Sequence, residues 1–393
     1  MGGNIEELAK AVRQTNAWAC YDCGKCTATC PVARVGGGLS PRRHVLAAVT
    51  GQSTAALSDG SLAACLTCGL CDERCPAKVR FTDLVLELRR LQGAAASEPE
   101  CPHGGALQSM MRMMARGTTT QKRLGWLEDH HRVAPTSGPV LLWTGCTPYY
   151  DAFFPELGAV TLNGTRAAVE VLNALGIEPV VSAEERCCGH DLLWNGDVQS
   201  FDALARHNLE LVAASGAETL VTPCAECLRT WRLDYPRFAK GKLPRTVHLT
   251  ELVAERLGEL PLRSNGERRV TYQDPCRLGR HLGVYEAPRR VLEAVPGLHL
   301  EEMRRTGTRA QCCAGGTWSS CDRYAKAIQV DRLREARATG AEVMATACPK
   351  CQIHFLCAMK DPKLGDEIRI ELRDVAELLA AALGSEGKGS DGH

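Results

Sequence analysis

The stretch that decides the fold is LVAASGAETLVTPCAEC at 211–227, because it returns at 333–351 as LREARATGAEVMATACPKC. Both copies read as a helix, a Gly-Ala turn, a buried strand and a Cys-x-x-Cys motif at the strand's end. A second pair of segments repeats in the same order: PVLLWTGC at 139–146 matches RRVTYQDPC at 268–276. Alternating strands and helices predict two α/β halves with mainly parallel sheets, in which ligands gather at the C-terminal ends of the strands. The cysteines fall at that edge.

Twenty-one cysteines are the outstanding feature of the composition. The N-terminal stretch MGGNIEELAKAVRQ lacks a secretion signal, and no apolar run approaches the roughly 18 residues of a membrane span. We therefore expect a cytoplasmic protein, with any membrane association made through a partner. A reducing compartment does not maintain many disulfides, so metal ligation is the natural use of the thiols. The net charge of +1 gives no electrostatic reason to expect nucleic acid.

The 393 residues are enough for two or three domains. The N-terminal part carries helix-like apolar periodicity between its cysteine clusters, and Ser40 followed by Pro41 is typical of a helix start. The stretch SMMRMMARG predicts a short helix whose methionines serve core or interface packing. The predicted segments are a helical domain at 1–95, a connector at 96–137, a first α/β half at 138–262, a second α/β half at 263–383 and a disordered tail at 384–393.

Two motifs in the helical domain have the form Cys-x2-Cys-x2-Cys-x3-Cys-Pro. They run from Cys20 to Pro31 and from Cys65 to Pro76. Three closely spaced thiolates can hold three irons of a cubane [4Fe-4S] cluster, while the proline turns the chain so that the fourth cysteine serves the other cluster. Structural zinc is the alternative, but a four-cysteine zinc site does not demand this third thiol or the proline. The expected ligand sets are Cys20, Cys23, Cys26 and Cys75 for one cubane cluster, and Cys65, Cys68, Cys71 and Cys30 for the other.

Each α/β half supplies five cysteines in the same order. A single cysteine is followed after 40 or 35 residues by an adjacent pair, and after a further 35 or 34 residues by Cys-x-x-Cys. A cubane takes four ligands, so one thiol in each half is surplus unless it idles or bridges two irons. Neighbouring side chains in an extended chain point to opposite faces, so aiming both at one metal requires a bend, which the glycines after each pair permit. The sets are Cys146, Cys187, Cys188, Cys224 and Cys227 in the first half, and Cys276, Cys312, Cys313, Cys348 and Cys351 in the second.

Three other uses of these ten thiols stay open at this point. Zinc would take four thiols of each set and leave the fifth unexplained. A thioredoxin-like use of each Cys-x-x-Cys fits its place at a strand end but leaves three cysteines in each half without a use. Buried structural thiols are the usual fate of single cysteines, yet such thiols would not be expected to recur in the same five places twice.

The two five-cysteine sets resemble the CCG domains of the B-type polypeptide of heterodisulfide reductase, and residues 20–76 resemble the C-type polypeptide of the same enzyme. The chain is thus similar to the fused C and B polypeptides of the heterodisulfide reductase D type. The resemblance implies an α-helical ferredoxin-like domain followed by two pseudo-symmetric, Rossmann-like α/β halves. It also implies a non-cubane [4Fe-4S] cluster on each five-cysteine set, with a bridging thiolate as the fifth ligand. The cysteine pairs Cys187, Cys188, Cys312 and Cys313 would then lie at the reaction site.

The sequence departs from the family pattern in two places. The second pair is followed by Ala314, so it reads CCA rather than CCG, and the spacing of 40 residues after Cys146 is slightly long. Neither departure removes a ligand. We therefore expect both non-cubane clusters.

Charged and aromatic residues beside the ligand cysteines are further candidates. The charged ones would orient an anionic substrate or donate a proton, against which an ordinary supporting role is the plainer interpretation. Two tryptophans follow the paired cysteines at similar distances, which suits an apolar wall over a cluster as well as core packing. Three cysteines outside both patterns are expected to be ordinary thiols. The residues are His190, His281, Arg277 and Lys350 for the charged group, Trp194 and Trp318 for the tryptophans, and Cys101, Cys321 and Cys357 for the thiols.

The resemblance implies a subunit that passes electrons from a flavin-containing partner to a disulfide substrate. That partner would be an A-type subunit, an electron-transfer flavoprotein or a dehydrogenase, and a membrane cytochrome subunit is a further candidate. No GxGxxG stands in a dinucleotide context and no P-loop is present, so we expect no flavin or NAD in this chain. Disulfide chemistry predicts a substrate-sized gap between the two halves.

An alternative function is electron relay without substrate chemistry. The same architecture resembles the iron–sulfur subunit of glycolate oxidase. It also resembles subunits attached to electron-transfer flavoproteins, quinone-linked complexes and class II benzoyl-CoA reductase. The complete second cysteine set favours non-cubane chemistry in both halves, because a pure relay could dispense with one of them.

Overall fold

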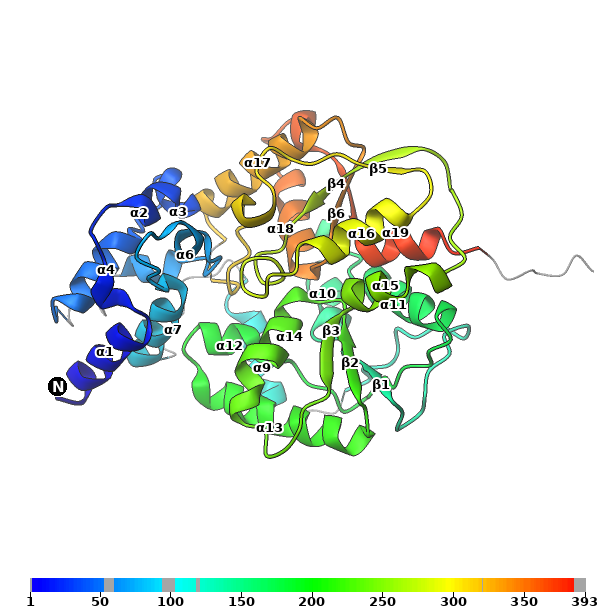
Figure 1. The fold of residues 1–393 in the computed structure, drawn as a ribbon, viewed down its shortest axis with the longest axis horizontal. Coiled ribbons are helices and arrows are strands. Elements are labelled where there is room, and N and C mark those ends of the chain that lie inside the picture. Colours follow the sequence, from blue (N-terminus) through cyan, green and yellow to red (C-terminus); the bar gives the residue numbers. More distant parts are fainter. Residues whose placement is uncertain (1, 53–59, 94–102, 118–120, 320, 385–393) are drawn as a thin grey trace, which may run out of the picture.

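The computed structural model describes residues 2–52, 60–93, 103–117, 121–319 and 321–384. Its N-terminal part is helical and is followed by two α/β halves (Figure 1). In this view the blue and cyan N-terminal helices stand at one end of the molecule. Cys101, for which we predicted an ordinary thiol, and residues 385–393 of the tail, for which we predicted disorder, lie outside the described residues. None of the described helices is both long and apolar enough to cross a membrane.

The N-terminal part consists of short helices with the cysteine loops between them. Its helices are α1 (Gly2–Gln14), α2 (Lys25–Thr29), α3 (Pro31–Arg34), α4 (Pro41–Val49), α6 (Leu70–Arg74) and α7 (Phe81–Gln92), and α9 (Ala106–Arg116) follows in the connector. The predicted helix start at Ser40 is confirmed, because its side chain accepts a hydrogen bond from the Arg43 N–H at 3.3 Å and Pro41 takes the first helical position. The apolar stripes of α1, α4 and α7 bury Leu8, Val45 and Leu84 against one another.

The first half contains a three-stranded parallel sheet in the order β1-β2-β3, and the second contains a four-stranded parallel sheet in the order β5-β4-β6-β7. The first half consists of β1 (Val140–Leu142), α10 (Thr147–Phe153), α11 (Leu162–Ala174), α12 (His190–Trp194), α13 (Val198–Ser215), β2 (Thr219–Thr222), α14 (Ala225–Arg229), β3 (Arg245–His248) and α15 (Leu249–Glu255). The second consists of β4 (Arg268–Gln273), α16 (Glu286–Ala294), β5 (Leu298–Leu300), α17 (Arg323–Arg337), β6 (Val343–Thr346), α18 (Pro349–Met359), β7 (Glu371–Asp374) and α19 (Val375–Ala381). The prediction of two α/β halves with parallel sheets is confirmed.

The repeated sequences fold alike. The stretch 211–227 forms the end of α13, strand β2 and the start of α14, and 333–351 forms the end of α17, strand β6 and the start of α18. Val221 in β2 pairs with Leu142, and Ala345 in β6 pairs with Tyr272. The central strands are buried, as apolar runs in a parallel sheet require. The cysteines that follow them are thereby carried to the same edge of each sheet.

The two sheets differ at one edge. Strand β5 pairs with β4 in the second half, whereas Val180 makes only isolated bridges to Ala134 and Leu141 in the first. The pseudo-symmetry therefore holds for the strands that carry cysteines and fails at the outer edge of the sheet.

Four helices join the halves: α11 and α15 from the first half pack with α16 and α19 from the second (Figure 1). Helix α19 begins with a capping box in which the Asp374 side chain accepts from the Ala376 N–H, while Glu377 accepts from the Asp374 N–H. Asp374 is buried and faces Gly164 of α11. The close approach of the two helices therefore depends on the missing side chain at Gly164.

Replacement of this glycine should loosen the joint between the halves. A Cβ at position 164 would lie 2.9 Å from Asp374 Cβ and 3.1 Å from its Cγ. We expect Gly164→Val to destabilise the protein by about 1–3 kcal/mol, the usual cost of overpacking. The check is a lower midpoint of thermal unfolding in anaerobically purified protein. Gly258→Ala, where the added Cβ meets no atom within 4 Å, is the control and should match the parent protein.

Candidate iron–sulfur centres

The two N-terminal motifs adopt the same local backbone. Asp22 and Thr67, which precede the second cysteine of each motif, have positive φ angles of 55° and 49°. Their N–H groups each lie 3.4 Å from a sulfur, that of Cys20 in the first motif and that of Cys65 in the second. Such hydrogen bonds are among the influences that set the potential of an iron–sulfur cluster. The loops are therefore shaped to surround a sulfur-bound group.

The structure groups the eight N-terminal cysteines around two cavities. We call Cys20, Cys23, Cys26 and Cys75 the outer set, and Cys65, Cys68, Cys71 and Cys30 the inner set. All four members of the outer set line one cavity and all four of the inner set line another. Each cavity thus contains the fourth cysteine of the opposite motif, and Cys71 lines both. This grouping agrees with the prediction that the fourth cysteine of each motif serves the other cluster, while the ligand assignment itself stays a prediction.

The two sets differ in their exposure to solvent. Cys23 of the outer set is exposed, whereas Cys30, Cys65 and Cys68 of the inner set are buried. Burial raises the pKa of the Cys30 thiol to about 12 and that of Cys65 to about 11. Free thiols at these two positions would stay protonated at neutral pH, so a metal that binds them must displace their protons.

The five-cysteine sets lie at the C-terminal edges of the two sheets. Cys224 and Cys348 stand two residues after β2 and β6, directly before α14 and α18. Cys146 follows β1 and precedes α10, and Cys276 follows β4. The paired cysteines reach the same edges on the loops before α12 and α17. This is the place where open parallel sheets bind their ligands.

Within each five-cysteine set, neighbouring thiols shift one another's pKa in a continuous series. The order in the first set is Cys146, Cys187, Cys188, Cys227 and Cys224. The order in the second is Cys276, Cys312, Cys313, Cys351 and Cys348, with 3.2 Å between the sulfurs of Cys313 and Cys351. The same five positions converge in both halves, and soft thiolates are the donors that iron–sulfur clusters and zinc prefer. The donor sets therefore fit an iron–sulfur cluster.

Left-handed backbone makes the predicted bend after each cysteine pair. Gly189 has a φ of 79°, and Ala314 takes the same conformation at 59° although it has a side chain. A third bend, at Gly145, leaves room for sulfur, because a Cβ there would lie 2.6 Å from Cys227 Sγ. The departure from CCG to CCA thus leaves the bend intact.

The inner set and the second five-cysteine set touch. A hydrogen bond with Cys312 lowers the pKa of Cys68 to about 5, more than burial raises it. Cys312 also contacts Cys276 and Cys313. The cavity of the inner set and that of the second half are adjacent, because Leu66 lines both.

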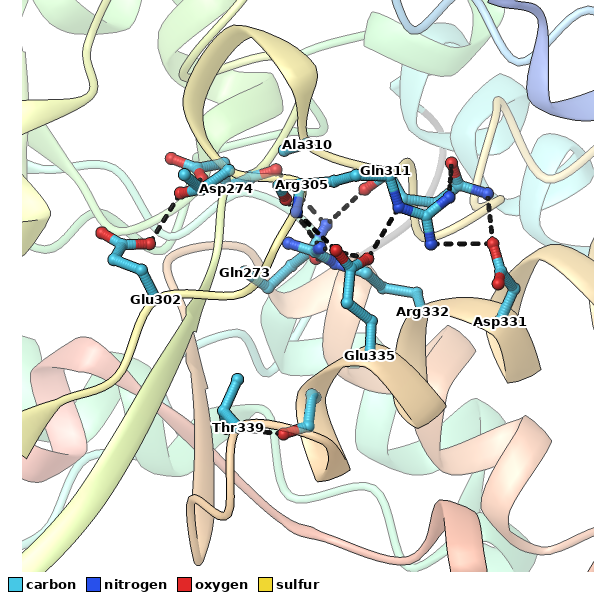
Figure 2. A network of polar contacts seen from close by, with 12 residues as sticks. Gln273, Asp274, Glu302, Arg305, Ala310, Gln311, Asp331, Arg332, Glu335 and Thr339 are labelled. Carbon is cyan, nitrogen blue, oxygen red and sulfur yellow. Dashed lines mark hydrogen bonds and ion pairs between the residues drawn. The ribbon is translucent and has the colours of Figure 1, made fainter.

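A polar network holds the loops of the second set in place (Figure 2). Arg332 Nε donates to Gln273 Oε1 at 2.6 Å, and the Gln273 amide donates to Gln311 O at 3.1 Å. Arg305 reaches the side chain of Gln311 at 3.2 Å and is paired with Glu335 at 2.9 Å. Gln311 directly precedes Cys312, so the network fixes where the cysteine pair begins.

A buried ion pair that the sequence did not predict supports the first five-cysteine set. Glu185 accepts hydrogen bonds from the Gly145 N–H at 2.6 Å and the Thr144 N–H at 3.1 Å, and it pairs with buried Arg123 at 2.6 Å. These contacts hold the loop that carries Cys146. No sequence signal points to the pair, because Arg123 lies in the connector and Glu185 stands 62 positions further on.

A buried ion triad fills the region between the two halves where we expected a substrate-sized gap. Lys350 Nζ lies 2.5 Å from Asp191 Oδ1 and 2.7 Å from Glu226 Oε2, and the lysine is 2% exposed. Burial acts to lower the pKa of Lys350, but the two carboxylates together raise it, so the ammonium stays charged. The cavity beside it, lined by the second set, has about 20 Å³, room for about one water molecule.

The other charged candidates belong to the same buried region. Arg277 Nε donates to His190 Nε2 at 2.9 Å, and its Nη1 lies 2.9 Å from His281 Nε2. Burial and the arginine lower the pKa of His190, so this imidazole is neutral and accepts the hydrogen bond. The arginine also lies 4.7 Å from the ring centre of Trp194. These residues support the loops and one another.

The remaining candidates lie apart from the sulfurs or pack beside them. Trp318 stacks on Phe154 and lies under the Lys350 ammonium, 5.1 Å from it. Cys357 lies on the last turn of α18, where its sulfur is 3.5 Å from Lys326 Nζ. Cys321 is half-buried just before α17. Neither thiol lines the cavities of the inner, outer or second five-cysteine set.

Comparison with known proteins identifies the modules. The cysteine-rich CCG domain matches residues 140–232 and 270–356, and the 4Fe-4S dicluster domain matches residues 16–79. These domains and the observed fold define an iron–sulfur electron-transfer protein.

Several relatives resemble most of the chain. It is 30% identical to the D component of the dihydromethanophenazine:CoB–CoM heterodisulfide reductase of Methanosarcina acetivorans, over 95% of this chain and 96% of that protein. It is 27% identical to the B component of the fumarate reductase (CoM/CoB) of Methanothermobacter marburgensis, over 92% of this chain and 72% of that protein. An EtfAB:quinone oxidoreductase of Syntrophomonas wolfei is 27% identical over 81% of this chain and 46% of its own length. The chain belongs to the heterodisulfide reductase D family.

Serine variants should show which motif each fourth cysteine serves. Because Cys75 lines the outer cavity and Cys30 the inner one, we expect Cys75→Ser to alter the same electron paramagnetic resonance (EPR) signal as Cys23→Ser. Cys30→Ser should alter the signal that Cys65→Ser alters. Cys357→Ser is the control and should leave both signals intact. If Cys75→Ser altered the signal that Cys65→Ser alters, the prediction that each fourth cysteine serves the cluster of the other motif would be wrong.

Proposed function

We propose that the protein carries electrons from the outer set through the inner set to the two five-cysteine sets. The observation that carries this proposal is the position of Leu66, which lines both the inner cavity and the cavity of the second five-cysteine set. Arg280 joins the same two regions, because it donates to Cys68 O and to Ala310 O. Cys71 gives a second point of continuity, because it lines both the outer and the inner cavity. When bound, the clusters would supply one-electron transfer at each of the four sets.

Two kinds of cluster suit the two kinds of donor set. The outer and inner sets each offer four cysteines around a cavity, as a cubane [4Fe-4S] cluster requires. Each five-cysteine set offers one thiol more, and all five belong to a single chain of contacts. A non-cubane [4Fe-4S] cluster with a bridging thiolate uses the fifth donor.

The exposed side of the outer set is the proposed input face. Trp18 and Tyr21 are 65% and 70% exposed on either side of Cys20, and Cys23 is itself exposed. Lys25 is exposed beside Tyr21 and lines the same cavity as the outer set. An apolar centre with a basic rim suits a flavin-containing donor protein whose own docking surface is apolar with an acidic rim.

Charge reversal on the input face should slow electron uptake. We expect Lys25→Glu to lower the rate of reduction by reduced flavodoxin, an acidic flavoprotein, about 3- to 10-fold at low ionic strength, because electrostatic steering is lost. The effect should shrink as salt is added. Anaerobic stopped-flow absorbance measures the rate. Lys240→Glu, at an exposed site in the first half, is the matched control. Equal slowing by both variants would show that electrons enter the protein at another surface.

We propose a disulfide as the terminal acceptor. The relatives whose names identify them as D components of heterodisulfide reductases support this choice. The reaction consumes two electrons and two protons, breaks the S–S bond and releases two thiols. Two five-cysteine sets suit it because each would deliver one of the two electrons.

Pure electron relay is the second candidate. The observation that favours it is the Lys350 triad, which occupies the region where a disulfide would have to lie between the halves. A disulfide that reacts there has to displace this ion pairing. In a relay the ion pairs of the triad stay formed, and the acceptor is a partner protein or a quinone-linked complex.

Reoxidation of the reduced protein separates the two candidates. The protein is reduced anaerobically and mixed with CoM-S-S-CoB, with simpler disulfides, or with the one-electron acceptor ferricenium. The disulfide reaction predicts reoxidation with two thiols released for every two electrons lost. Rapid reoxidation by ferricenium alone, with no thiol released from any disulfide, supports the relay and contradicts disulfide chemistry.

A further inference from the structure

Arg89 of α7 binds the backbone at the loop that carries the inner set. Its Nη2 donates to Cys65 O at 2.9 Å and to the carbonyls of Leu62 and Ala63 at 3.0 and 3.1 Å. Its Nη1 donates to Trp194 O, in the first half, at 2.9 Å. Arg89 is 1% exposed, and its hydrogen-bond partners within the described ranges are all backbone carbonyls.

Two further arginines reach the same loop from the second half. Arg277 donates to Thr67 O, and its Nη2 donates to Thr67 Oγ1 at 2.6 Å. Arg280 Nε donates to Cys68 O at 2.6 Å, and its Nη1 donates to Ala310 O at 2.7 Å. Three guanidiniums from two domains therefore surround the backbone that carries Cys65 and Cys68. We call Arg89, Arg277 and Arg280 the arginine clamp.

The clamp forms no direct ion pair with a carboxylate among the described residues, although Glu226 attracts Arg277 over a longer distance. Within that part of the chain, no carboxylate lies at ion-pairing distance from any of its three guanidiniums. Buried arginines elsewhere in the protein do have one: Arg123 pairs with Glu185, Arg229 with Asp234 and Arg332 with Glu335. Burying a charge without a counter-charge costs free energy, so the three guanidiniums require an anion nearby. The thiolates of the inner set are the anionic groups whose backbone it holds.

The outer motif lacks this excess of positive charge. Asp22, at the position equivalent to Thr67, pairs with Arg42 at 3.1 Å, and both side chains are about half exposed. The charge of this pair is thus balanced, and the exposed Lys25 beside the outer set is screened by water. Nearby cations stabilise the reduced, more negative state of a cluster, and they do so more strongly when buried.

We propose that the arginine clamp raises the reduction potential at the inner set and so favours electron arrival beside Cys312. This inference rests on the proposed function, because it assumes that the inner set holds a cluster. Arg89 belongs to the N-terminal domain, while Arg277 and Arg280 belong to the second half. The full charge therefore surrounds the inner set only when these two domains are docked.

The test is an EPR-monitored redox titration of the intact, anaerobically purified protein. The inner signal is the one that Cys65→Ser alters. Arg280→Gln keeps a donor for Cys68 O but removes the charge, so the midpoint potential of the inner signal should fall while that of the outer signal stays constant. Arg280→Lys keeps the charge and should restore most of the midpoint. Arg232→Gln removes an arginine paired with Glu251 on the first half and is the control, with both midpoints unchanged.

Thr67→Asp gives a second route if Arg280→Gln disturbs folding. The outer motif has an aspartate, Asp22, at the equivalent position, where φ is also positive. The substitution would also place a carboxylate beside Arg277. The inner midpoint should fall here too. An unchanged inner midpoint with the signal intact, or an equal fall in Arg280→Gln and Arg280→Lys, overturns the clamp. If Cys65→Ser alters no EPR signal at all, the ligand assignment is overturned instead, which distinguishes the two failures.

Discussion

The junction between the inner set and the second five-cysteine set is the feature on which the rest of the arrangement depends. It lies where the N-terminal domain meets the edge of the second sheet. Arg277 and Arg280 stabilise the same junction by binding the carbonyls of Thr67 and Cys68. A helical domain and a duplicated α/β fold, each of which carries its own sulfurs, thereby become one continuous array of thiols.

Duplication explains how two separate halves place ten cysteines so similarly. In a parallel sheet, every strand that carries a cysteine at its C-terminal end delivers it to one edge, and both halves use this geometry. The paired cysteines come from loops, which need more support. Glu185 holds the loop that carries Cys146 in the first set, and the Arg305 and Arg332 network holds the loop before the second pair. The two halves use different side chains for the same task.

Much of this architecture can be predicted from the sequence, because periodicity and repetition are local signals. The helix start at Ser40, the two parallel sheets and the grouping of cysteines at strand ends follow from such patterns. The Lys350 triad does not, since its acids lie 159 and 124 positions away in the other half. Nor does the pairing of Arg277 with Thr67, 210 positions apart. Long-range partners of single charged residues leave no periodic trace, so the filled space between the halves could not be foreseen.

The left-handed backbone at Ala314 has to be held by packing. Left-handed backbone costs a residue with a side chain about 1–2 kcal/mol, so the turn after Cys312 and Cys313 is disfavoured in the free chain. Packing has to impose it, and Leu66 of the N-terminal domain lies 3.5 Å from where a Cβ of Gly316 would stand. The second cysteine set is thus packed in part by the N-terminal domain, so the shape of this set depends on contacts from outside its own α/β half.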